Sequence, residues 1–157
     1  MEIQEAAPEG AVLEELIGLS RKWEQENSCW GYRENGPEDI QGRRVFVARE
    51  NGKLIGYLFG KMALSRDAQS IMPEGTEYFF VEELYVRPDR RSQGIGGRLF
   101  RFAEEALRGE TDYIRLGTAT KNWKAILHFY LEEMGMTFWS AGLFKNISKK
   151  SEDEETV

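Results

Sequence analysis

The segment from Glu82 to Leu99, EELYVRPDRRSQGIGGRL, constrains the fold more than any other part of the chain. A strand-like run ends at Val86, Pro88 begins a turn, and a basic, glycine-rich loop leads into a helical pattern that starts near Gly94. Glycines let a ligand approach the backbone closely, and the free N–H groups at a helix start attract phosphate. The segment therefore predicts a strand–loop–helix unit that binds a phosphate-bearing ligand.

Two common phosphate-binding loops do not fit this spacing. A P-loop requires Gly-Lys-Ser or Gly-Lys-Thr, and neither Lys-Ser nor Lys-Thr follows the glycines here. A dinucleotide-binding fingerprint requires a third small residue where this chain has Leu99. It also sits early in a βαβ unit, whereas strand-like runs of an antiparallel meander precede this loop. The spacing therefore excludes both motifs.

Length and composition limit the remaining function classes. The chain has 157 residues, 41% of them apolar, which suits one domain, expected over 1–148, with an acidic flexible tail over 149–157. A single cysteine, Cys29, and a single histidine, His128, make a zinc site unexpected, so we expect no metal. The net charge of −6 argues against nucleic acid as the partner. No apolar run is long enough to span a membrane and the first residues do not resemble a signal peptide, so we expect a cytoplasmic protein without a membrane partner.

Hydrophobic periodicity predicts a mixed α/β fold. Strand patterns cover residues 2–6, 44–49, 53–64, 76–86, 113–117, 137–140 and 143–147. Helical patterns cover residues 8–27, 94–109 and 122–133, and 28–42 reads as a loop that has room for a short helix. The dipeptide Asn51-Gly52 predicts a tight antiparallel hairpin.

These parts together resemble the GNAT acetyltransferase superfamily. Its defining loop has Gln or Arg, two residues of any type, Gly, any residue, then Gly or Ala, and it reads here Arg91-Ser92-Gln93-Gly94-Ile95-Gly96. The family's second motif resembles Asn122, Ala125, Phe129-Tyr130 and Gly135, although Met136 stands where the family usually has Phe. The resemblance covers residues 1–147. It implies a mostly antiparallel sheet of about seven strands, flanked by about four helices and splayed between its central strands.

The resemblance also implies a cofactor site for acetyl-CoA. Backbone N–H groups of the loop would hold the pyrophosphate, contributed by Gln93, Gly94, Ile95, Gly96 and Gly97, with Arg91 and Ser92 at the rim. The pantetheine arm would pair with the strand end at Leu84, Tyr85 and Val86, and the Leu84 N–H would donate to the thioester oxygen. Asn122 would cap its helix, contact the pantetheine arm, or do both.

The same resemblance suggests catalytic residues. Tyr130 matches a tyrosine that many members place near the coenzyme sulfur as general acid, although its spacing also suits a core aromatic. An alkyl ammonium must lose a proton before it can attack, and a carboxylate can accept that proton. Glu82, which matches a glutamate of aminoglycoside-modifying relatives, is our choice for this base. Strand alternation directs Glu83 to the opposite face unless a bulge intervenes.

The acceptor is less constrained than the cofactor. Trp30, Tyr32 and Glu83 are candidate substrate contacts, because aromatic faces and carboxylates suit an organic cation. This combination favours a small cationic amine, such as a polyamine or an aminoglycoside, as the partner. A peptide N-terminus, a lysine side chain, a longer acyl donor and a GNAT module that binds acyl-CoA without catalysis stay open. A base formed by Glu83 or by a water chain also stays open, as does a homodimer formed through exposed strand edges.

Overall fold

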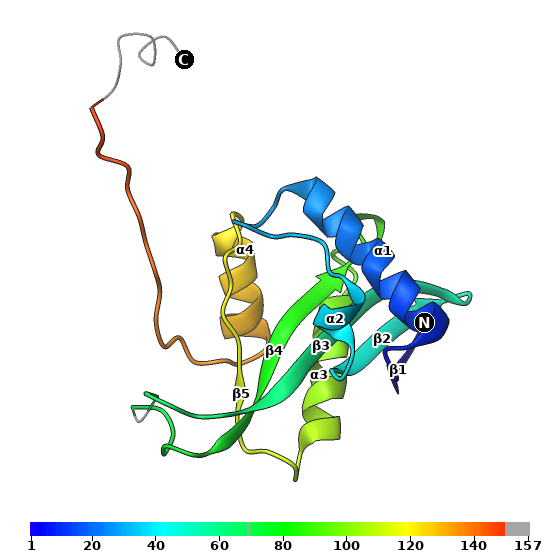
Figure 1. The fold of residues 1–157 in the computed structure, drawn as a ribbon, viewed down its shortest axis with the longest axis horizontal. Helices are drawn as coiled ribbons and strands as arrows, with labels where there is room; N and C mark the ends of the chain where they lie inside the picture. Colours follow the sequence, from blue (N-terminus) through cyan, green and yellow to red (C-terminus); the bar gives the residue numbers. More distant parts are fainter. Residues whose placement is uncertain (69, 150–157) are drawn as a thin grey trace.

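Five strands lie side by side in chain order in one mixed sheet (Figure 1). The computed structural model describes residues 1–68 and 70–149, so residues 150–157 of the expected acidic tail lie outside the described residues. The elements are β1 (Glu2–Ala6), α1 (Gly10–Glu26), α2 (Pro37–Ile40), β2 (Arg44–Glu50), β3 (Lys53–Leu64), β4 (Glu77–Val86), a 3₁₀ turn (Pro88–Arg90), α3 (Ile95–Leu107), β5 (Ile114–Arg115), α4 (Trp123–Leu127) and a π-helical turn (His128–Glu133). The predicted mixed α/β fold is confirmed.

The first four strands form an antiparallel meander, and β5 joins β4 in parallel. The hairpin between β2 and β3 turns at Asn51 and Gly52, with φ angles of 52° and 78°, as the Asn-Gly signal predicts. The parallel pairing follows from the connection through α3, since parallel neighbours require a crossover. The loop expected over 28–42 contains only the short helix α2.

Side chains that alternate along the strands form one apolar layer on each face of the sheet. Helix α3 covers one face, in a cluster that includes Phe46, Leu58, Phe79, Val81, Leu99 and Phe100. Helices α1 and α2 cover the other face, in a cluster that includes Leu16, Ile40, Val45, Val47, Tyr57 and Tyr85. These two layers hold β4, the strand that carries the predicted site, in the middle of the molecule (Figure 1).

A β-bulge interrupts the pairing of β3 with β4. Phe59 is opposite Glu83 and Gly60 is opposite Val81, which leaves Glu82 as the extra residue on β4. Val81 and Leu84 consequently contact the same α3 cluster, although three residues apart on a regular strand would place them on opposite faces. The strand approaches so closely here that a Cβ on Gly60 would lie 2.1 Å from the Phe80 carbonyl oxygen. Only glycine fits at this position.

The sheet is open between β4 and β5. These strands pair only at Phe79 with Ile114 and at Phe80 with Arg115, while β4 continues to Val86. In the described part of the chain, no strand pairs with that edge of β4 beyond Phe80. The chain after β5 turns instead to the loop that follows α1, where the Trp30 N–H donates to the Ala119 carbonyl at 2.8 Å. The splay that the family resemblance implies is therefore present.

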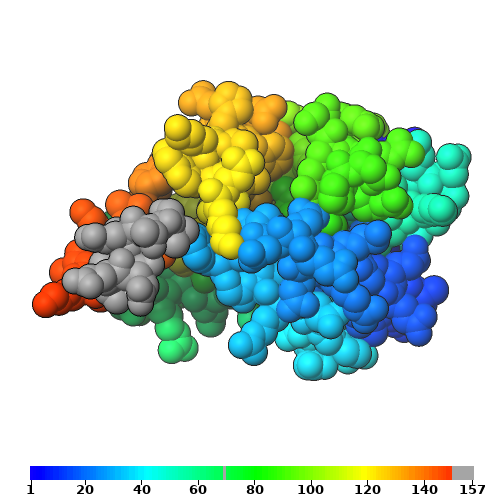
Figure 2. Space-filling model, turned by 90° about the horizontal axis from the view of Figure 1, so that it is seen from above, coloured from blue at the N-terminus to red at the C-terminus, as the bar shows by residue number. Residues whose placement is uncertain are grey.

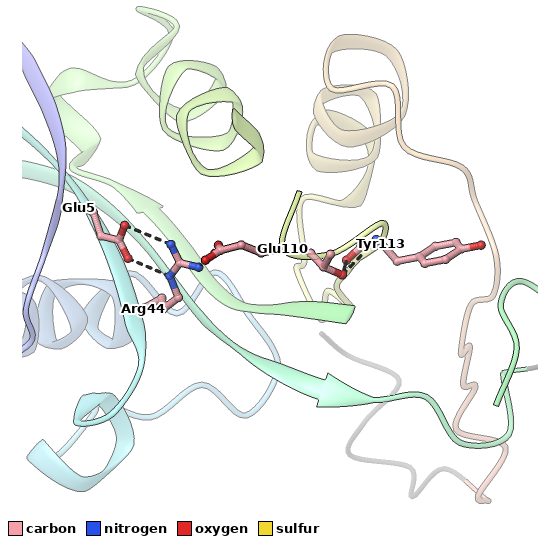
Figure 3. Close-up of polar contacts among 5 residues, drawn as sticks. Glu5, Arg44, Glu110 and Tyr113 are labelled. Carbon is pink, nitrogen blue, oxygen red and sulfur yellow. Dashed lines mark hydrogen bonds and ion pairs between the residues drawn. The ribbon is translucent and has the colours of Figure 1, made fainter. Parts of the chain in front are cut away.

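A cluster of ion pairs joins β1 and β2 to the segment after α3, at the end of the sheet opposite the glycine-rich loop (Figure 3). Arg44 on β2 donates to both carboxylate oxygens of Glu5 on β1, at 2.8 and 3.2 Å, and also to Glu110 after α3. Beside it, Thr111 accepts from the Tyr113 N–H at 3.3 Å. Because these side chains are largely exposed, the ion pairs contribute little to the free energy of unfolding. They serve mainly to hold the α3–β5 connection against the meander.

The two closing strands predicted over residues 137–140 and 143–147 are wrong. Residues 137–149 run away from the body without strand pairing, and the described residues form five strands where about seven were expected (Figure 1). The apolar residues of this segment are left exposed, with Leu143 at 96% and Ile147 at 86%. Side-chain contacts, such as the edge of Phe144 on Trp30, connect residues 137–149 to the rest of the chain. Pairing with a second copy stays a prediction.

Substituting Gly60 tests the bulge. Gly60→Ala should lower the free energy of unfolding by about 2–3 kcal/mol, because the added methyl meets backbone that cannot move aside. Gly18→Ala is the matched control: Gly18 lies within α1 with no atom within 4 Å of an added Cβ, so alanine there should stabilise by about 0.5–1 kcal/mol. Urea unfolding monitored by circular dichroism measures both. Equal effects for the two variants would contradict the tight approach at Gly60.

Candidate active site

The glycine-rich loop has the geometry of an anion-binding site. Ser92 and Gly94 have φ angles of 62° and 78°, and Gly94 is the N-cap of α3, which begins at Ile95. Among the described residues, no acceptor is present for the N–H groups of residues 92–97. Successive free N–H groups at the start of a 13-residue helix favour a phosphate group. The Ile95 side chain is buried in the core, so only its backbone can serve this loop.

Arg91 is held in place beside the loop. Its Nε donates to the Val86 carbonyl at 2.9 Å and its Nη2 to Glu26 at 2.9 Å, while its guanidinium lies 5.3 Å from the Tyr85 ring. The side chain thus joins the strand end to the last turn of α1. Because the Tyr85 hydroxyl also donates to Glu26, at 2.5 Å, the Tyr85 side chain faces α1. Its backbone lies opposite Tyr57 and, like that of Arg87, is directed at β3 rather than at the free edge of β4.

The free edge of β4 presents backbone groups to the opening. The Arg87 N–H donates to the Ile55 carbonyl on β3 at 2.9 Å. Since alternate residues of a strand direct their N–H and C=O groups to opposite edges, those of Leu84 and Val86 point away from β3. These are the groups that the sequence analysis assigned to the pantetheine arm. The Val86 carbonyl already accepts from Arg91, which leaves both N–H groups and the Leu84 carbonyl.

Tyr130 lies on the π-helical turn, and such turns are frequent at functional sites. Its ring packs edge-on against Phe100 of α3 and Phe129, and it belongs to the same apolar layer as Leu84. Burial, with a smaller contribution from nearby Cys29, raises the pKa of Tyr130 to about 12. The phenol therefore stays protonated at neutral pH. Within the described residues its hydroxyl has no hydrogen-bond partner, so it is available to a ligand.

Asn122 occupies the N-cap position of α4, but its side chain forms no capping hydrogen bond. Its backbone N–H donates to the Thr120 hydroxyl at 3.1 Å, and its carbonyl accepts from Ile126 at 3.1 Å. Of the roles considered for Asn122, the side-chain cap is therefore absent, and contact with the pantetheine arm stays a prediction.

The two adjacent glutamates of β4 have different surroundings. Glu82 forms an ion pair with Arg43, with Oε1 2.5 Å from Nε, and both side chains are partly exposed. Glu83 points into the α1 side of the sheet, where the Tyr57 hydroxyl donates to its Oε1 at 2.7 Å. The bulge explains how Glu83 reaches this face next to Glu82. Glu82 and Glu83 are expected on opposite faces of the sheet only if no bulge intervenes, so that expectation does not apply here.

Glu83 is the centre of a half-buried polar cluster. Its Oε1 also accepts from the Tyr32 hydroxyl at 2.9 Å, and Asn35 Nδ2 lies 3.0 Å from both carboxylate oxygens. Burial raises the pKa of Glu83, hydrogen bonds from Tyr57, Asn35 and Tyr32 oppose that shift, and the charge of Glu82 adds to it. Burial likewise raises the pKa of Tyr57 and Tyr32, so both phenols stay protonated donors.

The candidate substrate residues separate into two places. Tyr32 joins Glu83 directly, and its ring stacks on Trp23 at 4.3 Å between centroids. Trp30 is 58% exposed and contacts Lys121 and Phe144 at the rim of the loop. The structure therefore brings Tyr32 and Glu83 together and leaves Trp30 outside that cluster.

Three participants escaped the sequence analysis, namely Ser20, Asn35 and Tyr57. Tyr57 lies in an apolar strand, a pattern that indicates a core residue. Ser20 lies among the apolar residues of α1, where no pattern marks it as part of a site. Asn35 sits in a Gly-Pro-containing loop and reads as a turn residue. Because these residues precede Glu83 by 26 to 63 positions in the sequence, no local pattern indicates that they belong to its cluster.

From above, the elements of the site share one face of the molecule (Figure 2). The glycine-rich loop, in green, and the start of α4, in yellow, lie beside the blue helix α1. A glycine-rich helix start, a free strand edge, a partly buried phenol and a half-buried carboxylate are thus contributed by β4 and the elements that pack around it. Such an arrangement can hold an acyl thioester and receive a proton from a nucleophile.

The model of the acetyltransferase (GNAT) family matches residues 11–136. A soil metagenomic aminoglycoside acetyltransferase in complex with sisomicin superposes with a TM-score of 0.68 and 17% identity, covering 94% of this chain and 96% of that chain. Ribosomal-protein-alanine N-acetyltransferase from Brucella melitensis biovar Abortus 2308 has a TM-score of 0.65 and 15% identity, with coverages of 93% and 100%. An aminoglycoside N-acetyltransferase in complex with CoA has a TM-score of 0.65 and 17% identity, with coverages of 94% and 100%.

A search among curated proteins finds no match. At identities this low, the structural likeness shows the fold alone. Within residues 1–68 and 70–149, no group of three or more His, Cys, Asp and Glu side chains is arranged to hold a metal ion. None of the helices described has the length and apolarity that crossing a membrane requires.

The buried position of Glu83 predicts how stability depends on pH. Its folded pKa lies above the ordinary value of 4.5, so the folded wild type loses stability as pH rises from 4.5 through that folded pKa. Glu83→Gln cannot titrate and escapes this loss. Its free energy of unfolding relative to wild type should therefore rise between pH 4.5 and 7.5, by about 1.4 kcal/mol for each unit by which the pKa is raised. Urea unfolding at both pH values measures this, and a constant difference would contradict it.

Proposed function

This chain belongs to the acetyltransferase (GNAT) family, and from that membership we propose that it transfers the acetyl group directly to the primary amine of a small cationic molecule. The chain is an acetyl-CoA-dependent N-acetyltransferase. The observation that supports a cationic acceptor is Glu83, a carboxylate held half-buried by three hydrogen-bonding side chains beside the free edge of β4. A desolvated carboxylate attracts an ammonium group more strongly than an exposed one does.

The loop and the strand edge fit the cofactor. The free N–H groups of residues 92–97 would hold the pyrophosphate, with the dipole of α3 adding positive potential. The N–H groups of Leu84 and Val86 suit a pantetheine arm that pairs like an added strand. In this arrangement the Leu84 N–H stabilises the negative charge that develops on the thioester oxygen during attack.

We assign the proton acceptor to Glu83 rather than to Glu82, which the sequence analysis chose. Glu82 is engaged by the guanidinium of Arg43, an ion pair that has to break before the carboxylate can accept a proton. Glu83 combines a raised pKa with one oxygen, Oε2, that accepts from Asn35 alone. A carboxylate with a raised pKa is a stronger base.

Tyr130 assists the departing sulfur. With a pKa raised to about 12, its phenol is a weaker acid than a thiol of pKa about 8.5, so complete proton transfer to the thiolate is uphill. Donation of a hydrogen bond to the developing thiolate requires no such transfer and stabilises the same charge. We therefore expect Tyr130 to act through a hydrogen bond, with the proton reaching the thiol from solvent.

The loop between α1 and α2 supports a small acceptor over a protein. Asn35 and Tyr32 close this loop onto β4 through Glu83, and Arg21 pairs with Glu34 on its outer side at 2.9 Å. A peptide chain requires an extended groove along the sheet, which a closed loop obstructs. A small amine needs no such groove.

The first test is thiol release from acetyl-CoA with polyamines, aminoglycosides, amino acids and peptides with free N-termini. We expect turnover with a small polyamine or aminoglycoside. Tyr130→Phe should lower kcat by roughly 10–100-fold with little change in KM, because the hydrogen bond forms only as charge develops on sulfur. Turnover of peptides alone would transfer the proposal to a protein acceptor. Cofactor binding without any turnover would favour a non-catalytic module.

Two isosteric substitutions on adjacent residues test the base. Glu83→Gln should lower kcat/KM by about 100-fold or more, the usual contribution of a general base, whereas Glu82→Gln should change it less than about fivefold. Both variants remove one charge from β4, so a purely electrostatic role would affect them alike. The reverse order of effects would restore Glu82 as the base.

A further inference from the structure

The Ser20 hydroxyl is fully buried and joins α1 to the loop that covers β4. It lies 2.7 Å from the Tyr32 hydroxyl. The Asn35 backbone N–H and side-chain Nδ2 both donate to it, at 2.8 and 3.1 Å. Three groups of one loop thus depend on a single helix hydroxyl.

Counting donors and acceptors fixes the direction of each hydrogen bond. An ionised Glu83 can only accept, so the Tyr32 O–H donates to it. The Tyr32 oxygen must then accept the proton of Ser20, whose two lone pairs receive the two Asn35 donors. The result is a directed chain from Asn35 through Ser20 and Tyr32 to Glu83. Each donor in such a chain polarises the next, which strengthens the last bond.

The contacts of Glu83 are unequal between its two oxygens. Oε1 receives Tyr32, Tyr57 and Asn35, at 2.9, 2.7 and 3.0 Å. Among the described side chains, Oε2 receives only the Asn35 amide, at 3.0 Å, through a hydrogen that it shares with Oε1. A carboxylate has about two lone-pair positions on each oxygen, so Oε1 is saturated and Oε2 retains capacity.

We propose that Ser20, Tyr32 and Asn35 are positioning residues that saturate Oε1 of Glu83 and leave Oε2 open to the proton of the acceptor amine. This rests on the proposed role of Glu83 as base. Because two of the positioning groups, Tyr32 and Asn35, belong to the loop after α1, the base is complete only while that loop lies on β4. The same contacts therefore set both the reactivity of the base and access to it.

The titrating groups around Glu83 define what a pH profile reports. Tyr32 faces it from the loop and Tyr57 from β3, and both phenols remain protonated through the range of interest. Glu82, adjacent on β4, is paired with Arg43. When the Tyr32 hydroxyl is absent, Glu83 loses a donor that stabilises its charged form while burial persists, so its pKa rises.

The test is the pH dependence of kcat/KM between pH 5 and 9 for Tyr32→Phe, with the best amine of the acceptor panel. The acid limb should shift upward by about one pH unit, so that kcat/KM falls by up to about tenfold on that limb and stays within about twofold of wild type on the high-pH plateau. Tyr113→Phe removes a phenol hydroxyl from an exposed side chain and should leave the profile unchanged.

Asn35→Ala provides a second variant in the loop, where a deleted side chain does not create a core cavity. It should shift the acid limb in the same direction, because Glu83 loses the donor shared by its two oxygens. Acid limbs that coincide with wild type in both folded variants, while Glu83→Gln is impaired, would overturn the positioning role and leave the base intact. Wild-type activity in Glu83→Gln would instead overturn the base assignment itself.

Discussion

One tight backbone approach, at Gly60, determines how this protein presents its chemistry. The approach accommodates the extra residue of the β4 bulge, and that residue resets which face each later side chain occupies. Glu83 consequently enters the polar cluster beneath α1, while Leu84 returns to the α3 core. The pairing of β4 with β5 ends at Phe80, two residues before the bulge. The buried carboxylate, which the bulge directs to the α1 side, therefore lies on the same stretch of β4 as the free strand edge.

The polar cluster resolves the conflict that burying a carboxylate creates. Desolvation disfavours the charge, and three donors offset part of that cost without abolishing it. Complete compensation would produce a strongly acidic, unreactive carboxylate, whereas no compensation would leave a neutral acid that cannot accept a proton. Stability is sacrificed at such a site to keep the group reactive, which is a common compromise in enzymes.

The sequence predicts the elements whose signals are local. The Asn51-Gly52 hairpin, the helices and the glycine loop before α3 depend on residues close together in the chain, and the structure confirms them. The prediction of two closing strands, over residues 137–140 and 143–147, is wrong because an apolar pattern does not show whether a partner strand is present. The Glu83 cluster could not be predicted for a related reason. Its register depends on a bulge, and its donors come from distant segments.

The two halves of the site therefore depend on different parts of the sequence. The proposed cofactor half is made of backbone N–H groups on a continuous loop and strand end, so its signature is short and resists side-chain substitution. The proposed acceptor half is made of side chains from α1, the following loop, β3 and β4, and we expect one substitution at Tyr32 or Asn35 to alter it without affecting the glycine-rich loop. Acceptor preference can thus diverge while the family motif persists, which explains why the family is evident from the motif and the acceptor must be identified by assay.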